Sequence, residues 1–256
     1  MRRVLVLGGT SEGRAVAAEL VGAPDVEVVS SLAGRVNDPR LPEGEVRVGG
    51  FGGVDGLTEW VRGNGIDAVV DATHPFAARI TANAAAATQS LGVPLLVLRR
   101  PEWTPRPGDR WQVVPDLPSA AAALPGLGSR VFLTIGRQGV DAFAGSGGWF
   151  LIRAIDPPEV AVPPDSETLL ARGPFTVSDE IALMRQRRIE VVVTKNSGGA
   201  LTSAKLEAAR ELGLPVVMVA RTPIPAGIAS TSDVAVAAEW ARGPVACPHE
   251  RRPTTR

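Results

Sequence analysis

A glycine-rich loop close to the start of the chain has the residue types and the spacing of a phosphate-binding turn. It is formed by Gly8, Gly9, Thr10, Ser11, Glu12 and Gly13. A short apolar run precedes it and a helical pattern follows, as in a dinucleotide-binding fingerprint, although Thr10 replaces the middle glycine. We expect the Thr10 and Ser11 hydroxyls to compensate as donors to a pyrophosphate at the helix N-terminus. Glu12 is expected to contact the cofactor away from the phosphate, toward a ribose, or to serve as an acid at the helix start.

The residues at the end of the second predicted strand indicate which dinucleotide is bound. NAD enzymes usually place an acidic residue there, on the ribose 2′-hydroxyl. This chain has Ser31 and Arg35 in that region instead. Because guanidinium binds phosphate in a bidentate way, the pattern favours NADPH as the cofactor.

A third loop follows the fourth predicted strand, as Asp71-Ala72-Thr73-His74-Pro75-Phe76. In an open parallel sheet this loop lies near the bound cofactor, so we expect Thr73, His74 and Pro75 to contact it. His74 is a candidate proton donor, and solvent is the alternative.

Two further loops combine a cation with glycine. One contains Thr194, Lys195, Asn196, Ser197, Gly198 and Gly199, and the other is Ile135-Gly136-Arg137-Gln138-Gly139. Neither is a P-loop, but each offers a charge and free backbone N–H groups to an anion. We therefore predict that a polyanionic substrate is bound by Arg137, Thr194, Lys195, Ser197, Gly198 and Gly199.

Composition excludes several classes. The chain has 256 residues with 27 basic and 27 acidic side chains, which argues against nucleic acid as a partner. One cysteine and two histidines make a metal site unexpected. The absence of tyrosine excludes the tyrosine-dependent chemistry of short-chain dehydrogenases. We expect a cytoplasmic protein without a membrane span, because the apolar segment 80–98 is interrupted at Gly92-Val93-Pro94 and resembles a helix followed by a strand.

The predicted elements alternate between apolar strands and helices, which is typical of a parallel α/β sheet covered on both faces. A weak repeat, in which Thr73 matches Thr194, suggests two similar halves. We predict two Rossmann-like parallel-sheet domains with a cleft between them: residues 1–100 bind NADPH, residues 101–243 bind substrate, and residues 244–256 form a flexible tail. Residues 101–118 are predicted to be a connector without regular structure.

Taken in order, these motifs resemble the precorrin-6A reductase family of cobalamin biosynthesis. The resemblance runs from about Arg3 to Ala241, and includes Lys205-Leu206-Glu207-Ala208-Ala209-Arg210 besides the loops above. It implies an NADPH-dependent oxidoreductase that transfers a hydride to one double bond of a corrin precursor, precorrin-6A, giving precorrin-6B. The substrate is a polycarboxylate tetrapyrrole, which fits the cationic loops.

Other functions stay open at this point. The related reductase of the anaerobic route acts on cobalt-precorrin-6A and has the same fold. A reductase of a smaller acid, a non-catalytic NADPH-binding sensor and a sugar-nucleotide-binding protein would each use the same first loop. Retention of the product for hand-over to the next pathway enzyme, the oligomeric state and the proton donor are not decided by the residues.

Overall fold

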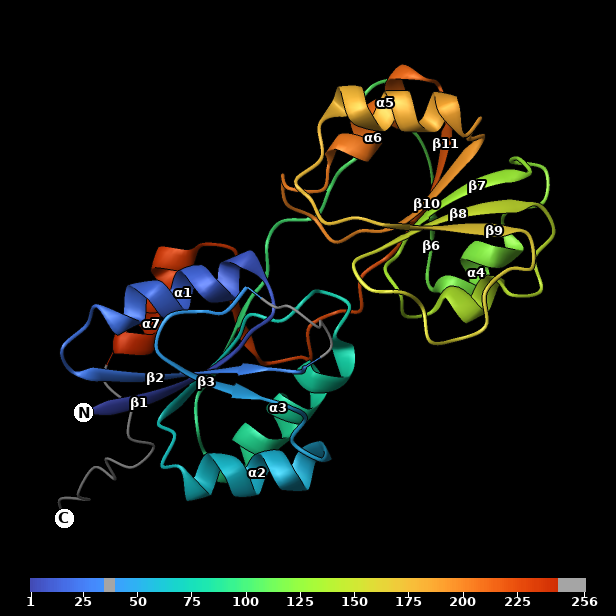
Figure 1. The fold of residues 1–256 in the computed structure, drawn as a ribbon. Helices are drawn as coiled ribbons and strands as arrows, with labels where there is room; N and C mark the ends of the chain where they lie inside the picture. The colour runs from blue at the N-terminus through green and yellow to red at the C-terminus, as the bar shows by residue number, and fades with distance from the viewer. Residues whose placement is uncertain (35–39, 244–256) are drawn as a thin grey trace, which may run out of the picture. The chain divides into compact units, whose positions relative to one another are not determined.

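The chain forms two α/β units, each built on a six-stranded, wholly parallel sheet. The computed structural model describes residues 1–34 and 40–243. Contacts divide the chain into a first unit of Met1–Arg100 and Pro223–Arg256, and a second unit of Pro101–Thr222. Figure 1 shows the elements of both units. The prediction of two Rossmann-like parallel-sheet units is confirmed.

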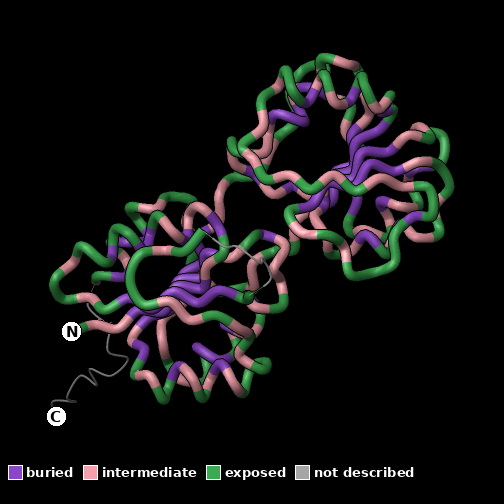
Figure 2. Tube along the Cα trace, viewed as in Figure 1, coloured by how far each residue is buried: buried purple, intermediate pink, exposed green. Residues whose placement is uncertain are grey.

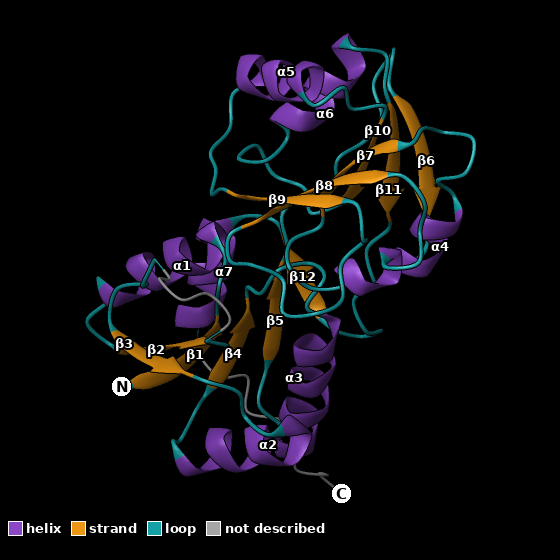
Figure 3. Ribbon diagram, turned by 45° about the vertical axis from the view of Figure 1, so that its right-hand side comes forward, coloured by secondary structure: helices purple, strands orange, loops and turns teal. Residues whose placement is uncertain are grey.

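In the first unit the strand order is β12-β5-β4-β1-β2-β3, and Figure 3 shows these strands from another side. The strands are β1 (Arg2–Leu7), β2 (Val26–Leu32), β3 (Glu45–Val48), β4 (Ala68–Asp71), β5 (Leu95–Leu98) and β12 (Ala229–Thr231). Helices α1 (Ser11–Val21) and α7 (Val234–Arg242) cover one face, and α2 (Gly53–Gly63) and α3 (Ala78–Leu91) cover the other.

In the second unit the order is β6-β11-β10-β7-β8-β9. The strands are β6 (Arg110–Val114), β7 (Arg130–Thr134), β8 (Trp149–Ala154), β9 (Ser166–Leu170), β10 (Val191–Lys195) and β11 (Pro215–Val219). Helices α5 (Val177–Gln186) and α6 (Ala204–Glu211) cover one face, and α4 (Leu117–Ala122) lies on the other. A short 3-10 helix, η1 (Val140–Phe143), stands where the first unit has α1.

The central strands of both sheets are buried on both faces, as the purple tube in Figure 2 shows. In the first unit Val4 and Val6 pack toward α1 and α7, and Leu5 and Leu7 pack toward α2 and α3. This explains why these strands appear in the sequence as unbroken apolar runs. The segment 80–98 is confirmed as a helix and a strand, and no helix among the described residues is long and apolar enough to cross a membrane.

The predicted boundary of the second unit at residue 243 is wrong. β12 pairs with β5, and α7 packs against α1, so the chain returns to the first unit at Pro223. The prediction of an irregular connector over 101–118 is also wrong, because β6 pairs with β11 there. Each of these strands completes the edge of a sheet that would otherwise expose the backbone of β5 or β11.

Candidate functional site

The glycine-rich loop joins the carboxyl end of β1 to α1, as predicted. The Gly8 N–H donates to the Ser31 carbonyl at 2.9 Å, and Gly9 adopts a φ of 112°, which side chains disfavour. A Cβ on Gly13 would lie 3.3 Å from the Gly8 Cα and 3.4 Å from the Ala72 Cβ. Gly13 therefore allows the helix to approach the strands, and the start of α1 faces the loop.

Thr10 is the N-cap of α1. Its hydroxyl accepts from the Gly13 N–H at 3.0 Å and donates to the Ala72 carbonyl at 2.7 Å. The Ser11 hydroxyl donates to the Glu12 carboxylate at 3.0 Å. The Thr10 hydrogen is thus donated to the loop after β4 and the Ser11 hydrogen to Glu12, which differs from the expectation that both hydroxyls donate to a pyrophosphate. In general, the groups that can bind an anion at such a position are the backbone N–H groups of the helix N-terminus.

Glu12 is directed to Arg100, which follows β5. The Arg100 guanidinium lies 3.2 Å from the Glu12 carboxylate. Partial burial raises the pKa of Glu12, but its own N–H, Arg100 and Ser11 outweigh burial, so the pKa lies below the ordinary value. Glu12 therefore stays ionised and ties the loop to β5. Sequence reasoning missed Arg100, because its partner is 88 residues away.

The ends of β1, β4 and β5 meet around a small cavity. Its lining consists of Thr10, Glu12, Thr73, Pro75, Leu98, Arg99 and Arg100. The fold thus brings together four residues that the sequence predicts for cofactor binding, from two loops more than sixty residues apart. This is the carboxyl edge of the sheet, where open α/β sheets bind their ligands.

Asp71 organises the loop that contains His74. This carboxylate is buried, and it accepts from the Thr73 N–H at 3.0 Å, the Thr73 hydroxyl at 2.6 Å and the Thr81 hydroxyl at 2.6 Å. His74 is exposed, and its Nδ1 accepts from the Phe76 N–H at 3.3 Å. In a neutral imidazole the hydrogen is then on Nε2. Asp71 was not among the predicted site residues.

Ser31 lies buried at the end of β2, and its hydroxyl accepts from the Arg47 guanidinium at 3.1 Å. Arg35, the other residue predicted to select NADPH, lies outside the described residues. Arg47 was missed by sequence reasoning, since only the pairing of β2 with β3 places it opposite Ser31.

In the second unit the two cationic loops are neighbours, as predicted. Lys195 Nζ donates to the Ile135 carbonyl at 2.9 Å. Burial lowers the pKa of Lys195 to about 8. Arg137 pairs with Glu159 at 2.8 Å, and Thr194 is buried with its hydroxyl bonded to backbone. The carboxyl ends of β7 and β10 therefore carry two basic side chains, of which Arg137 is paired with a carboxylate and Lys195 is bonded to a backbone carbonyl.

Asn196 and Gly198 hold the segment that enters the second unit. The Asn196 Oδ1 accepts from the Trp103 N–H at 2.9 Å, and its Nδ2 donates to the Trp103 carbonyl at 3.2 Å. Trp103 Nε1 donates to the Gly199 carbonyl at 2.8 Å. A Cβ on Gly198 would collide with the Pro101 carbonyl oxygen and with Arg221. Asn196 and Gly198, within the loop predicted to bind substrate, therefore have a structural role.

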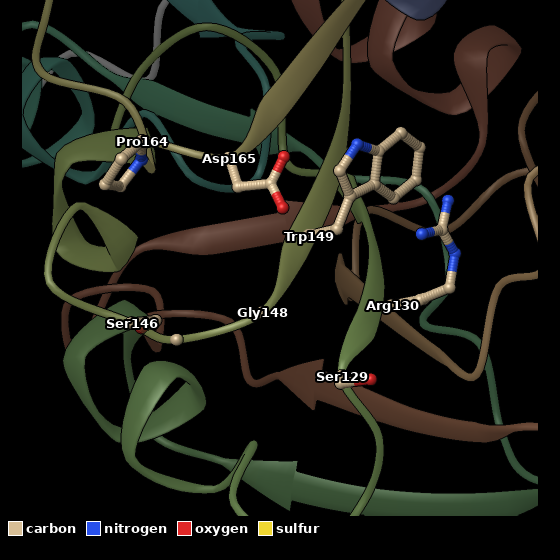
Figure 4. Close-up of a pocket in the computed structure, with 8 residues that line it drawn as sticks. Ser129, Arg130, Ser146, Gly148, Trp149, Pro164 and Asp165 are labelled. Atoms are coloured by element: carbon tan, nitrogen blue, oxygen red, sulfur yellow. The ribbon is translucent and has the colours of Figure 1, made fainter.

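A hollow in the second unit lies away from these loops. A cavity of about 470 Å³ is lined by Arg130, Trp149, Asp165 and neighbouring residues, shown in Figure 4. Arg130 stacks 4.0 Å above the Trp149 ring. These residues stand at the amino ends of β7, β8 and β9. Because ligands of open α/β sheets bind at the carboxyl ends, we do not take this cavity as the active site.

Two parallel sheets share the strand order β5-β4-β1-β2-β3 and β11-β10-β7-β8-β9, and the first carries a glycine-rich loop, which places this chain among the two-unit Rossmann-like α/β proteins. The chain belongs to the precorrin-6x reductase CbiJ/CobK family, whose model matches residues 3–242.

Named relatives agree with the family match over nearly the whole chain. A precorrin-6A reductase of Rhodococcus erythropolis is 65% identical over 94% of this chain and 97% of that protein. A precorrin-6A reductase of Mycobacterium tuberculosis is 55% identical over 95% and 98%. The solved structure of CobK precorrin-6A reductase has a TM-score of 0.86 at 45% identity, covering 94% of this chain and 96% of that one.

Proposed function

We propose that this protein is an oxidoreductase that reduces precorrin-6A to precorrin-6B, a step in building the corrin ring of cobalamin. The observation that carries the proposal is the 65% identity, over nearly the full length of both chains, to a precorrin-6A reductase. The reaction reduces one double bond of the macrocycle and therefore needs a hydride donor.

NADPH is the donor we propose, bound by the first unit. The open backbone at Gly9 and the start of α1, at the carboxyl edge of a parallel sheet, support the binding of a dinucleotide. The side-chain-free backbone at Gly9 and the N–H groups of Thr10 and Ser11, at the start of α1, would hold the pyrophosphate. Ser31, without an acidic neighbour on its strand end, favours the 2′-phosphorylated cofactor. When bound, NADPH would supply the hydride.

The second unit would hold the carboxylate arms of the substrate. Lys195 and Arg137 provide cations at the carboxyl ends of β10 and β7, and Ser197 and Gly199 add hydroxyl and backbone groups. Because Lys195 is anchored by two loop carbonyls, its ammonium is held in one place. A fixed cation loses little conformational freedom when a carboxylate binds.

The chemical demands on the protein are modest. It must hold the donor and acceptor carbons together and exclude water, which contributes up to roughly 7–11 kcal/mol to lowering a barrier. A proton must also reach the macrocycle. His74 Nε2 is the donor we favour, since Nδ1 is occupied by the Phe76 N–H and Asp71 fixes the loop.

The test is turnover of precorrin-6A by the purified protein, followed by loss of the reduced nicotinamide absorbance and by the mass of the product. NADPH and NADH are run in parallel, and cobalt-precorrin-6A serves as the comparison substrate. We expect a gain of two hydrogens on precorrin-6A and faster turnover with NADPH. NADPH binding without turnover of precorrin-6A would discard the proposed substrate.

A further inference from the structure

The hollow at the amino ends of β7, β8 and β9 lies at the opposite end of its sheet from the two cationic loops. Its volume of about 470 Å³ is in the range of roughly 300–1,000 Å³ that small-ligand sites occupy. The residues that line it come from the three loops before these strands: Ser129, Arg130, Ser146, Gly147, Gly148, Trp149, Pro164 and Asp165. The proposed reduction uses none of them, so a ligand bound here is neither its cofactor nor its substrate.

Arg130 has a fixed guanidinium with unused donors. Its Cζ lies 4.0 Å from the centre of the Trp149 ring, and its Nε donates to the Arg187 carbonyl at 2.7 Å. Within residues 1–34 and 40–243, neither of its two Nη groups donates to an acceptor. A guanidinium with both Nη groups unused is suited to a carboxylate, which it binds through two parallel hydrogen bonds.

The acidic side chains closest to this guanidinium have other partners. The Glu190 Oε2 accepts from the N–H groups of Ser129 and Arg130 at 2.6 and 3.2 Å, so it is directed to the backbone. Glu167 pairs with Arg187 at 2.6 Å. Glu190 and Arg130 attract each other, but no ion pair of the described residues includes Arg130. The charge of Arg130 is therefore open to a ligand.

Asp165 provides the opposite charge on the other wall of the hollow. Arg130 pairs with Trp149 between β7 and β8, and Asp165 directly precedes Ser166, the partner of Phe150 between β8 and β9. The backbones of Arg130 and Asp165 are thus two strand spacings apart, roughly 10 Å. In the view of Figure 4 the Trp149 ring stands between the two charged groups. The Asp165 carboxylate is exposed and, in the part of the chain that the structure describes, has no hydrogen bond or ion pair.

The loop before β8, Gly145-Ser146-Gly147-Gly148, keeps the hollow open. A Cβ added at Gly145 or Gly147 would meet nothing within 4 Å. The N–H groups of Gly147 and Gly148 bond to no acceptor among the described residues. Exposed glycine backbone of this kind allows a ligand to approach closely and offers it additional donors.

We infer that this hollow binds a small zwitterion, with the ligand's carboxylate on Arg130 and its ammonium group on Asp165. The two charges of the ligand are several bonds apart, because β8 separates the two side chains. The aliphatic part of the ligand lies along Trp149 and Pro164, the apolar part of the lining. A ligand with one charge is attracted by one of the two side chains and repelled by the other, so the pair selects against it. The inference goes beyond the proposed reduction and does not depend on it.

The test compares four probes of similar size on the isotope-labelled full-length protein. ε-Aminocaproate carries both charges at its ends, its isomer norleucine carries them on one carbon, and hexanoate and hexylammonium carry one charge each. Binding is followed by the shift of the Trp149 indole N–H resonance, which Trp149→Phe assigns. We expect ε-aminocaproate to bind with a Kd of about 1 mM or below, and each of the other three to bind roughly 10-fold more weakly.

Variants of the two charged residues locate the site. Arg130→Gln and Asp165→Asn should each weaken ε-aminocaproate roughly 10-fold, because each removes one charge-assisted contact. Arg110→Gln is the matched control and should change nothing: Arg110 opens β6 at the same end of the sheet and also donates to a loop carbonyl, that of Gly213, but does not line the hollow.

Three results would overturn the inference. They are the absence of any shift with ε-aminocaproate, hexanoate or norleucine binding as tightly as ε-aminocaproate, and binding that is lost in Lys195→Gln but kept in Arg130→Gln, which would place the probe at the carboxyl edge. If Arg130→Gln does not fold, since Arg130 also holds the Arg187 carbonyl, Arg130→Lys and Asp165→Asn decide between the same outcomes. Turnover of precorrin-6A is measured separately, so either idea can fail while the other stands.

Discussion

Thr81 Oγ1 donates a 2.6 Å hydrogen bond to Oδ2 of Asp71, so the first turn of α3 is tied to the end of β4 through a buried carboxylate. The other carboxylate oxygen holds the backbone and the hydroxyl of Thr73. Asp71 therefore sets the path of the loop that contributes Thr73 and Pro75 to the small cavity.

Asp71→Asn should weaken both folding and cofactor binding. An amide offers one acceptor oxygen where the carboxylate offers two, so at least one of the three hydrogen bonds that Asp71 accepts loses its acceptor, at about 1–3 kcal/mol. Urea unfolding measures the stability and fluorescence titration the NADPH affinity. Asp67→Asn is the control: Asp67 accepts from the Arg3 N–H at the amino end of β4, so it should cost stability alone. If Asp71→Asn and Asp67→Asn changed NADPH affinity to the same extent, Asp71 would have no specific role in cofactor binding.

The pair of Glu12 and Arg100 predicts a pH dependence. The pKa of Glu12 is lowered in the folded protein, so the unfolded chain binds its proton more tightly. The stabilisation is complete above the unfolded pKa of about 4.3 and is lost as the pH falls through the folded pKa. The difference in unfolding free energy between the wild type and Glu12→Gln should therefore shrink at acid pH. Glu59→Gln, exposed on α2, should show no such change; a pH-independent difference for Glu12 would contradict the assignment.

A substitution of His74 tests whether the proton comes from this side chain or from solvent. If His74 is the donor, His74→Gln should lower kcat for precorrin-6A by roughly 10²-fold or more. NADPH affinity should stay unchanged, because Asp71 rather than His74 fixes the loop. Single-turnover measurement of hydride transfer and product release would locate the effect. An unaltered kcat would assign the proton to solvent.

The sheets could be predicted because their central strands are buried on both faces. Val4 to Leu7 and Val191 to Val193 are fully or almost fully buried, and such runs are apolar whatever their neighbours. The edge strand β6 has mostly exposed residues, so Arg110–Val114 shows no such pattern. β12 has only three residues and pairs with a strand more than 130 positions earlier.

The repeat was predicted in a shifted register. Val69 pairs with Leu95, and Val192 pairs with Val216, so Asp71 is the counterpart of Thr194 and the match of Thr73 to Thr194 is wrong by two residues. The prediction of the site is limited because strand pairing cannot be derived from the local sequence. Loop residues such as Gly8 and Thr73 follow from local sequence, but Arg47 and Arg100 are placed only by strand pairing and by contacts distant in sequence.

Lys195 links substrate binding to pH near neutrality. Its half-buried ammonium has a pKa of about 8. If this cation holds a substrate carboxylate, KM for precorrin-6A should rise above that pH in the wild type and stay level in Lys195→Arg, because arginine remains charged. KM for NADPH should show no inflection in either protein. A level wild-type profile for precorrin-6A would separate Lys195 from substrate binding.

A comparison of Gly198 with Gly213 measures how much stability depends on the close approach of the Pro101 backbone to Gly198. Both glycines have nearly the same backbone conformation, with φ of 67° and 66°. A Cβ at Gly213 meets nothing within 4 Å, whereas one at Gly198 collides with the Pro101 carbonyl. Gly213→Ala should therefore cost about 1–2 kcal/mol of unfolding free energy from the left-handed conformation alone. Gly198→Ala should cost about 1–3 kcal/mol more, because the segment must move. Urea unfolding of the two variants, followed by tryptophan fluorescence that includes Trp103, gives the difference. Equal losses would mean that the segment from Pro101 yields without cost, and that Gly198 is required only for its backbone angle.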